Sequence, residues 1–167
     1  MEVTLALQIL TTLIFLGGLV FTGMQLRMAQ AQRTREAALN LMRAYQTLDF
    51  VEAVGMLVDL PEGLGKSEVE AHLGPSAPKM MLLMLTLENI GLLVYQREVA
   101  IEIAEELFTA PIVMASRKLK RYIADTRAKA GVETPLEWFE WLADQMLRRR
   151  QNCPTPPAYV EHKNWKP

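Results

Sequence analysis

An apolar run without a charged residue extends from Val3 to Leu26. At about 1.5 Å per residue, a helix of this length spans roughly 36 Å, which exceeds a hydrocarbon core of about 30 Å. A cleaved secretory signal would need a basic start, a shorter apolar run and a small-residue cleavage site. We therefore predict a retained transmembrane anchor over residues 1–26, with a cleaved signal and a buried core helix as the alternatives.

The next segment has the pattern of a long helix. No glycine or proline interrupts the chain between Gly23 and Gly55, and the residues there are mostly strong helix formers. One apolar stripe recurs at three-, four- and seven-residue steps, formed by Leu41, Tyr45, Leu48, Val51 and Val58. We predict a single helix over residues 27–60, whose polar part at 27–36 is a stalk and whose remainder is the first bundle helix. Pro61 ends it.

A loop over residues 61–78, with one short helical turn after Ser67, is predicted to follow this helix. Residues 79–96 then form an apolar helix, and another helix begins near Val99. Pro111 must break or kink that later helix, because the proline ring clashes with the carbonyl one turn back.

The continuation over residues 112–130 is predicted to end at Gly131. A strong helix-start signal comes next. Thr134 suits the N-cap, Pro135 the first helical position and Glu137 the third. The sequence therefore predicts a last helix that begins at this threonine.

No segment of four to eight residues alternates like a strand, so we predict an all-α fold. Its parts are a single N-terminal transmembrane helix, the stalk, and a small cytoplasmic helical bundle over residues 79–152. The tail at 153–167 is rich in proline and is predicted to be extended, ordered only when a partner binds it.

One carboxylate interrupts the apolar run LMLTLENIGLLVY at residues 83–95. Helical geometry places Glu88 on the apolar face, whereas Asn89 faces water. A carboxylate in apolar surroundings must be paired or stay protonated. We predict a structural ion pair between Glu88 and an arginine of a neighbouring helix, with Arg43, Arg117 and Arg121 as candidates. A second membrane span is disfavoured here, because the run is short and carries a charge near its middle.

Charge sets the expected orientation and excludes one class of partner. The net charge of −1 gives no basic field of the kind that nucleic-acid binders use, so we expect no nucleic-acid partner. Only the amino group is basic before the span, whereas four arginines follow it: Arg27, Arg33, Arg35 and Arg43. The positive-inside rule therefore predicts an outside amino terminus and a cytoplasmic domain.

The motifs of known chemistry are missing from the sequence. It contains no nucleotide-binding glycine loop and no nucleophile elbow. The single Cys153 and the widely separated His72 and His162 offer no Cys/His metal cluster. We predict a protein that is not an enzyme and has no cofactor. The competing hypothesis, Glu88 as a catalytic acid or base, lacks a second group at a recognisable spacing.

Basic and aromatic side chains supply the candidate contact sites. A plain solvated surface is the first interpretation of the basic residues, and for a tethered domain anionic lipid headgroups or an acidic partner are the alternative. The candidate headgroup contacts are Arg27, Arg33, Lys118 and Arg121. Exposed aromatic rings favour partner docking, and the candidates are Trp138, Trp141, Tyr159 and Trp165.

These features together resemble a known family. The residues that carry the resemblance are the N-terminal span, the arginine-bearing stalk, the run LENIGLLV at 87–94 with Ile101 and Glu102 after it, and the ending LEWFEWLA at 136–143. This pattern resembles a bacterial family of membrane-anchored helical proteins catalogued as a domain of unknown function. The resemblance implies an anchor in the bacterial inner membrane and a cytoplasmic helical domain, and it implies no catalytic residues.

The function that we predict is that of a non-enzymatic accessory, assembly or scaffolding subunit, which docks its helical domain on a larger inner-membrane complex. The alternative is a self-associating anchor or sensor, whose spans and stalk helices pair while the cytoplasmic domain receives a signal. The expected partners are thus the membrane, other membrane-protein subunits or a second copy, and anionic lipids.

Overall fold

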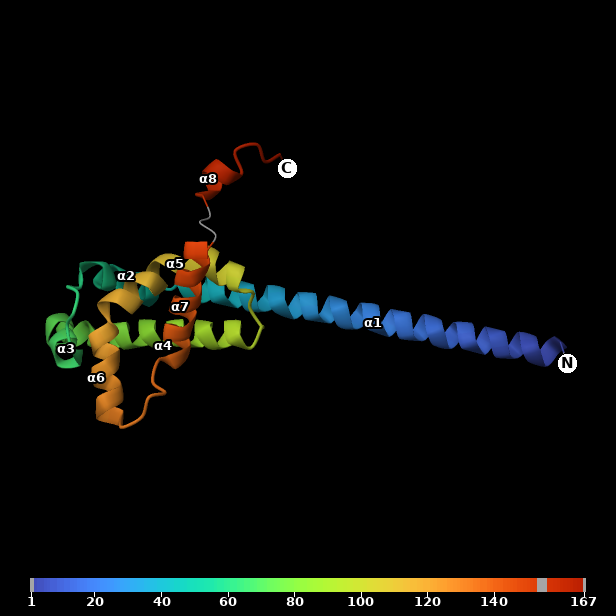
Figure 1. Cartoon of the computed structure of the whole chain (residues 1–167), viewed down its shortest axis with the longest axis horizontal. Coiled ribbons are helices and arrows are strands. Elements are labelled where there is room, and N and C mark those ends of the chain that lie inside the picture. The colour runs from blue at the N-terminus through green and yellow to red at the C-terminus, as the bar shows by residue number, and fades with distance from the viewer. Residues whose placement is uncertain (1, 153–155, 167) are drawn as a thin grey trace. The chain divides into compact units, whose positions relative to one another are not determined.

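A computed structural model describes residues 2–152 and 156–166, except for the side chains of residues 2–11, 13, 31, 33–35, 37, 38, 44 and 45. Over this part the chain is helical and has no strand (Figure 1), which confirms the all-α prediction. The elements are α1 Glu2–Tyr45, α2 Leu48–Asp59, α3 Lys66–Leu73, the 3₁₀ turn η1 Gly74–Ser76, α4 Ala77–Tyr95, α5 Ile101–Lys118, α6 Lys120–Ala130, α7 Glu137–Asn152 and α8 Ala158–Glu161. The chain divides into two units, Met1–Asn40 and Leu41–Pro167.

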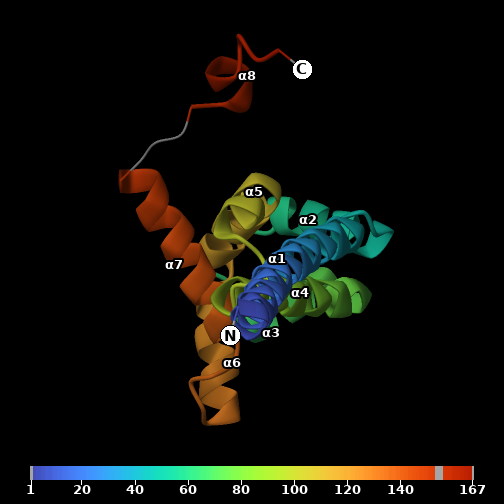
Figure 2. The ribbon, with the colours of Figure 1, turned by 90° about the vertical axis from the view of Figure 1, so that its right-hand side faces the viewer.

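The second unit is organised around α4. This helix packs against α2, α5 and α7, and Figure 2 shows α2 and α5 above it and α7 beside it. Its inner face contributes Met80, Leu83, Met84, Leu87 and Ile90 to the core, each almost fully buried. Phe50 of α2 meets Phe108 of α5 edge to face, with ring centroids 6.2 Å apart. The packing of this apolar interior fixes the positions of the helix ends, which form the sites described below.

The predicted single helix over residues 27–60 is wrong, because it is broken between α1 and α2. Thr47 has an extended backbone, and its hydroxyl accepts a hydrogen bond from the Phe50 N–H at 3.3 Å. It is thus the N-cap of a new helix. The break changes which face of α2 is buried. Phe50, Ala53 and Leu57 enter the core.

The apolar stripe predicted along this region is therefore not a core stripe in α2. Leu41 is buried, but Leu48, Val51 and Val58 are 72%, 55% and 52% exposed. α2 consequently carries two apolar stripes, one in the core and one on the surface. The surface stripe includes Gly55, beside which a Cβ would meet nothing within 4 Å.

The segment predicted as a loop over residues 61–78 is largely helical. Leu60 keeps an extended backbone before Pro61, so α2 ends where predicted. α3 and η1 then fill most of the segment. The first turn of α3 is held by two carboxylates: Glu68 accepts from the Gly65 N–H at 2.6 Å, and Asp125 of α6 accepts from the Lys66 N–H at 2.9 Å.

Pro111 does not break its helix. α5 continues past it, and the chain turns only at Leu119, whose φ and ψ are −99° and 7°. Pro111 and its neighbours Phe108 and Ile112 are buried, so packing holds the helix together across the one missing hydrogen bond. The next helix, α6, ends at Gly131 with a left-handed φ of 68°, as predicted.

The last bundle helix starts later than its local start signal indicates. α7 begins at Glu137, because Leu136 has a φ of 62° and cannot continue a right-handed helix. Its side chain is buried, 6% exposed. Thr134 accepts a turn hydrogen bond from the Glu137 N–H through its carbonyl oxygen at 3.3 Å. The first N–H groups of α7 therefore depend on a partner from elsewhere.

The predicted extended tail contains one short helix, α8, near its middle. Its residues 153–155 and 167 lie outside the described part of the chain. Tyr159 and Trp165 are 80% and 71% exposed.

One described helical stretch, Lys66–Tyr95, is long and apolar enough to cross a membrane by length and composition. A buried core helix passes the same test, and α4 within this stretch lines the core. The predicted span at the amino terminus includes side chains outside the described residues. It therefore stays a prediction.

Candidate functional site

Glu88 lies on α4 against the first turn of α7. Its Oε2 accepts a hydrogen bond from the Phe139 N–H at 2.7 Å. The first N–H groups of a helix have no partner within that helix, and the helix dipole makes this end positive. Glu88 is therefore an N-cap supplied by a different helix. Figure 1 shows α7 crossing α4 steeply.

The predicted ion pair of Glu88 is wrong for the two arginines on the later helices. Arg117 pairs with Glu62 at 2.9 Å, and Arg121 pairs with Glu68 at 3.2 Å. Arg43, the third candidate, is exposed in the last turn of α1. The half-buried carboxylate is balanced by backbone N–H groups and a helix dipole, which a sequence-based search for cations does not find.

Burial raises the pKa of Glu88, and two hydrogen bonds oppose this effect. The backbone N–H groups of Phe139 and Trp138 lower the pKa, Glu137 raises it, and the positive charge of Arg127 lowers it slightly. Desolvation dominates, so the pKa lies above its ordinary value.

Gly91 allows α4 and α7 to approach this closely. A Cβ on Gly91 would lie 2.2 Å from the carbonyl oxygen of Trp138 and 3.1 Å from the backbone nitrogen of Phe139. Glu88 and Gly91 are three residues apart and share one face of α4. We call this contact of the E-x-x-G face with the start of α7 the α4–α7 junction.

Three aromatic rings lie next to the α4–α7 junction. The Tyr95 ring is 4.3 Å from that of Trp138 and 5.8 Å from that of Trp141, and the two indoles are 6.4 Å apart. Tyr95 is 56% exposed. Trp138 and Trp141 are thus brought together with a third ring, whereas Tyr159 and Trp165 belong to the tail.

Lys118 is a second cross-helix cap. Its Nζ donates to the Val58 carbonyl at 2.6 Å, near the C-terminal end of α2, and the residue is only 9% exposed. A cation at a helix C-terminus complements the negative end of the dipole. The predicted headgroup contact of Lys118 is therefore wrong, because a buried lysine that caps α2 cannot reach a lipid.

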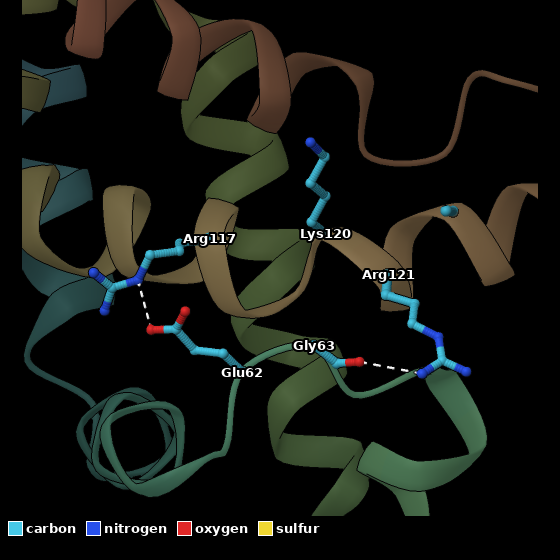
Figure 3. A pocket seen from close by; sticks show the side chains of 6 residues that line it. Glu62, Gly63, Arg117, Lys120 and Arg121 are labelled. Carbon is cyan, nitrogen blue, oxygen red and sulfur yellow. Dashed lines mark hydrogen bonds and ion pairs between the residues drawn. The ribbon is translucent and has the colours of Figure 1, made fainter.

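The remaining headgroup candidates lie in different places. Arg27 is exposed on α1, and the side chain of Arg33 is among those that the structure does not describe. The Arg121 side chain is 60% exposed and takes part in a shallow depression, which we call the basic hollow (Figure 3). Its volume is about 560 Å³, and it is lined by Glu62, Gly63, Arg117, Lys120, Arg121 and Ala124.

The ion pairs at the basic hollow are exposed. The side chains of Arg117 and Glu62 are 63% and 55% exposed, so their pair contributes at most about 1 kcal/mol. Arg121 also donates to the Gly63 carbonyl oxygen at 3.3 Å. For Lys120 no hydrogen bond or ion pair is found among the described residues.

Across the chain that the structure describes, no group of three or more His, Cys, Asp or Glu side chains could hold a metal ion. Glu88 uses its carboxylate on the backbone of α7. The geometry therefore offers structural caps, an aromatic cluster and the basic hollow.

No family model, no curated protein and no solved structure matches this chain. The resemblance to the bacterial membrane-anchored family thus stays a prediction.

Proposed function

We propose that this protein is a non-enzymatic accessory subunit of the bacterial inner membrane, which crosses the membrane once and docks its cytoplasmic helical bundle on a larger membrane complex. One observation carries the proposal. Large apolar side chains of α1 are each at least half exposed: Ile14, Phe15, Leu16, Leu19, Val20, Phe21, Met24, Leu26 and Met28.

These side chains surround the helix instead of forming one stripe. At about 100° per residue, the nine positions together point to all sides of the helix axis. A helix that is apolar all round belongs in a core or a membrane. The segment Val3–Leu26 carries no charge, whereas arginines follow it, which supports an outside amino terminus.

Docking is supported by apolar surface on a unit that already has a core. Leu48, Val51 and Val58 on α2 are each more than half exposed. The exposed ring of Tyr95, with the partly buried rings of Trp138 and Trp141 packed beside it, supplies a second apolar surface. Surfaces of this kind favour contact with another protein, because association removes apolar area from water.

Alkaline extraction of bacterial membranes tests the anchor. The full chain is expected to stay in the pellet, and release into the supernatant would contradict a membrane span. Orientation is read with Ser67→Cys in a Cys153→Ser background, since Ser67 is exposed on α3. A membrane-impermeant maleimide is expected to label it only after permeabilisation, and labelling in intact cells would reverse the topology.

Native electrophoresis in mild detergent tests docking. The full chain is expected to migrate with a stoichiometric partner. The double substitution Leu48→Ser with Val51→Ser is expected to release that partner. Val132→Ser is the matched control, because Val132 is also about half exposed but lies after α6. Migration of the wild-type chain alone as a monomer would refute the docking function.

The alternative, self-association, is favoured by the spacing of the surface stripe. Leu48, Val51, Gly55 and Val58 follow steps of three, four and three, the pattern of a coiled-coil seam. Oxidation of Val51→Cys in the Cys153→Ser background separates the two hypotheses. A disulfide-linked homodimer supports the seam, and its absence together with a stoichiometric foreign partner supports docking.

A further inference from the structure

The basic hollow joins two parts of the chain that are far apart in sequence. Arg117 lies in the last turn of α5, and Lys120 and Arg121 open α6. They face the loop between α2 and α3, which contributes Glu62 and Gly63. Figure 3 shows Arg117 pointing to Glu62 on one side and Arg121 pointing to the Gly63 carbonyl on the other.

Positive charge exceeds negative charge at this place. Three cations line the basic hollow against the single carboxylate of Glu62. Glu68, the second partner of Arg121, lies on α3 and does not line it. Lys120 points away from Gly63 in Figure 3, but its exposed, flexible stem lets the ammonium swing toward an added anion.

The existing ion pairs leave donors for a ligand. Arg117 uses its Nε for Glu62, and Arg121 uses one terminal nitrogen for Glu68. Each guanidinium has five N–H donors in a fork that matches phosphate oxygens. Both pairs are well exposed, so water screens them and they are readily exchanged for another anion.

We propose that the basic hollow binds a phosphate group through Arg117, Arg121 and Lys120. A phosphate group offers two or more acceptor oxygens outside its ester bonds and between one and two negative charges, so it can bridge the two guanidinium groups. The hollow is open and shallow, which suits a phosphate at the end of a larger molecule. The group comes either from an anionic lipid headgroup or from a soluble phosphate compound. This site does not depend on the docking proposed above.

Two titrations of the full chain in a neutral detergent distinguish these sources. The first adds inorganic phosphate against chloride at matched ionic strength, with the thermal unfolding midpoint and ³¹P line width as readouts. The second adds short-chain phosphatidylglycerol, with phosphatidylcholine as the neutral comparison, and detects bound lipid by native mass spectrometry. Saturation by phosphate supports a soluble ligand, and selective retention of phosphatidylglycerol supports a headgroup.

Matched charge changes separate a site from the general charge of the protein. Arg117→Gln and Arg121→Gln are each expected to weaken binding by about tenfold or more, and Lys120→Gln by about threefold. Lys129→Gln removes the same charge on α6 outside the hollow and is expected to change binding less than twofold.

Glu62→Gln supplies a test of opposite sign. Glu62 competes with the ligand for Arg117, so its neutralisation is expected to tighten binding by about threefold or more, whereas Glu106→Gln on α5 is expected to have little effect. Lack of saturation with both probes would overturn the proposal. Equal losses in Lys129→Gln and Lys120→Gln would overturn it as well, because binding would then follow net charge alone.

Discussion

Gly91→Ala is the sharpest perturbation of the α4–α7 junction. The added Cβ would lie 2.2 Å from the Trp138 carbonyl oxygen and 2.5 Å from its carbon. Both are backbone atoms, which cannot rotate away as the end of a side chain can. α7 must therefore move outward by about 1 Å to reach ordinary van der Waals contact. That movement also stretches the hydrogen bond from the Phe139 N–H to Glu88, which is now 2.7 Å long.

The expected cost follows from these contacts. Overpacking of a well-packed interior costs about 1–3 kcal/mol, and a weakened N-cap adds about 1 kcal/mol. Alanine regains about 1 kcal/mol, because it favours a helix more than glycine does. We expect a net loss of about 2 kcal/mol in the free energy of unfolding.

Gly55→Ala is the matched control. Gly55 is also helical, but a Cβ there meets nothing within 4 Å. Only the propensity gain remains, so this variant is expected to gain up to about 1 kcal/mol.

Urea unfolding of the full chain in mild detergent, followed by tryptophan fluorescence, measures both variants. Trp138 lies next to Gly91 and its ring contacts that of Trp141, so their fluorescence reports the junction. The midpoint is expected to fall for Gly91→Ala and to stay or rise for Gly55→Ala. If both variants shift the midpoint upward, the close approach of α4 and α7 is not a requirement of the fold.

Three further outcomes follow from the charged groups. The pKa of Glu88 lies above its ordinary value of 4.5, so its contribution to stability is complete below 4.5 and is lost as the pH rises through the raised pKa. The stability difference between wild type and Glu88→Gln, from urea melts at several pH values, should therefore fall over that interval, and a constant difference would contradict the role of burial. Lys118→Ala should cost about 1–3 kcal/mol in the same assay, because the Val58 carbonyl at the end of α2 loses its charged donor; an unchanged midpoint would show that Lys118 does not cap α2. Arg149→Gln should cost no more than about 1 kcal/mol, because its pairs with Glu102 at 2.7 Å and Glu105 at 3.0 Å are partly exposed, and a loss that persisted in 1 M salt would argue against an electrostatic cause.

Helix ends in this bundle are completed by side chains from other helices. Glu88 of α4 caps the start of α7, Asp125 of α6 holds the start of α3, and Lys118 of α5 caps the end of α2. Each charge meets the helix end of opposite dipole sign. The charged residues on the inner faces thus orient the helices as well as stabilise them.

Local sequence rules were sufficient to predict the all-α class and those helix ends that depend on local chemistry. Pro61 forces an extended backbone on Leu60, and Gly131 accepts the left-handed conformation that ends α6. The sequence also indicated that Glu88 needs a partner in an apolar setting. The start of α2 could also have been predicted, because Thr47 followed by Asp49 is a local signal for a helix N-terminus. The apolar stripe favoured one continuous helix instead.

The sequence located the basic cluster but not the basic hollow. Arg117 and Arg121 are recognisable as neighbours in a charged run. Glu62 and Gly63 come from a loop more than fifty residues earlier, and only folding brings them to the same place.

The partners of the buried charges and the buried face of α2 depend on how the helices pack, and the sequence did not predict them. Local rules place the start of the last helix at Thr134. In the fold it starts at Glu137, after Leu136 in a left-handed conformation. There the first turn of α7 packs against Gly91 and receives the carboxylate of Glu88. All residues except proline have the same backbone N–H and carbonyl groups, so no sequence pattern marks those at helix ends as partners. Their availability depends on where helices end and cross, which is a property of the packed fold.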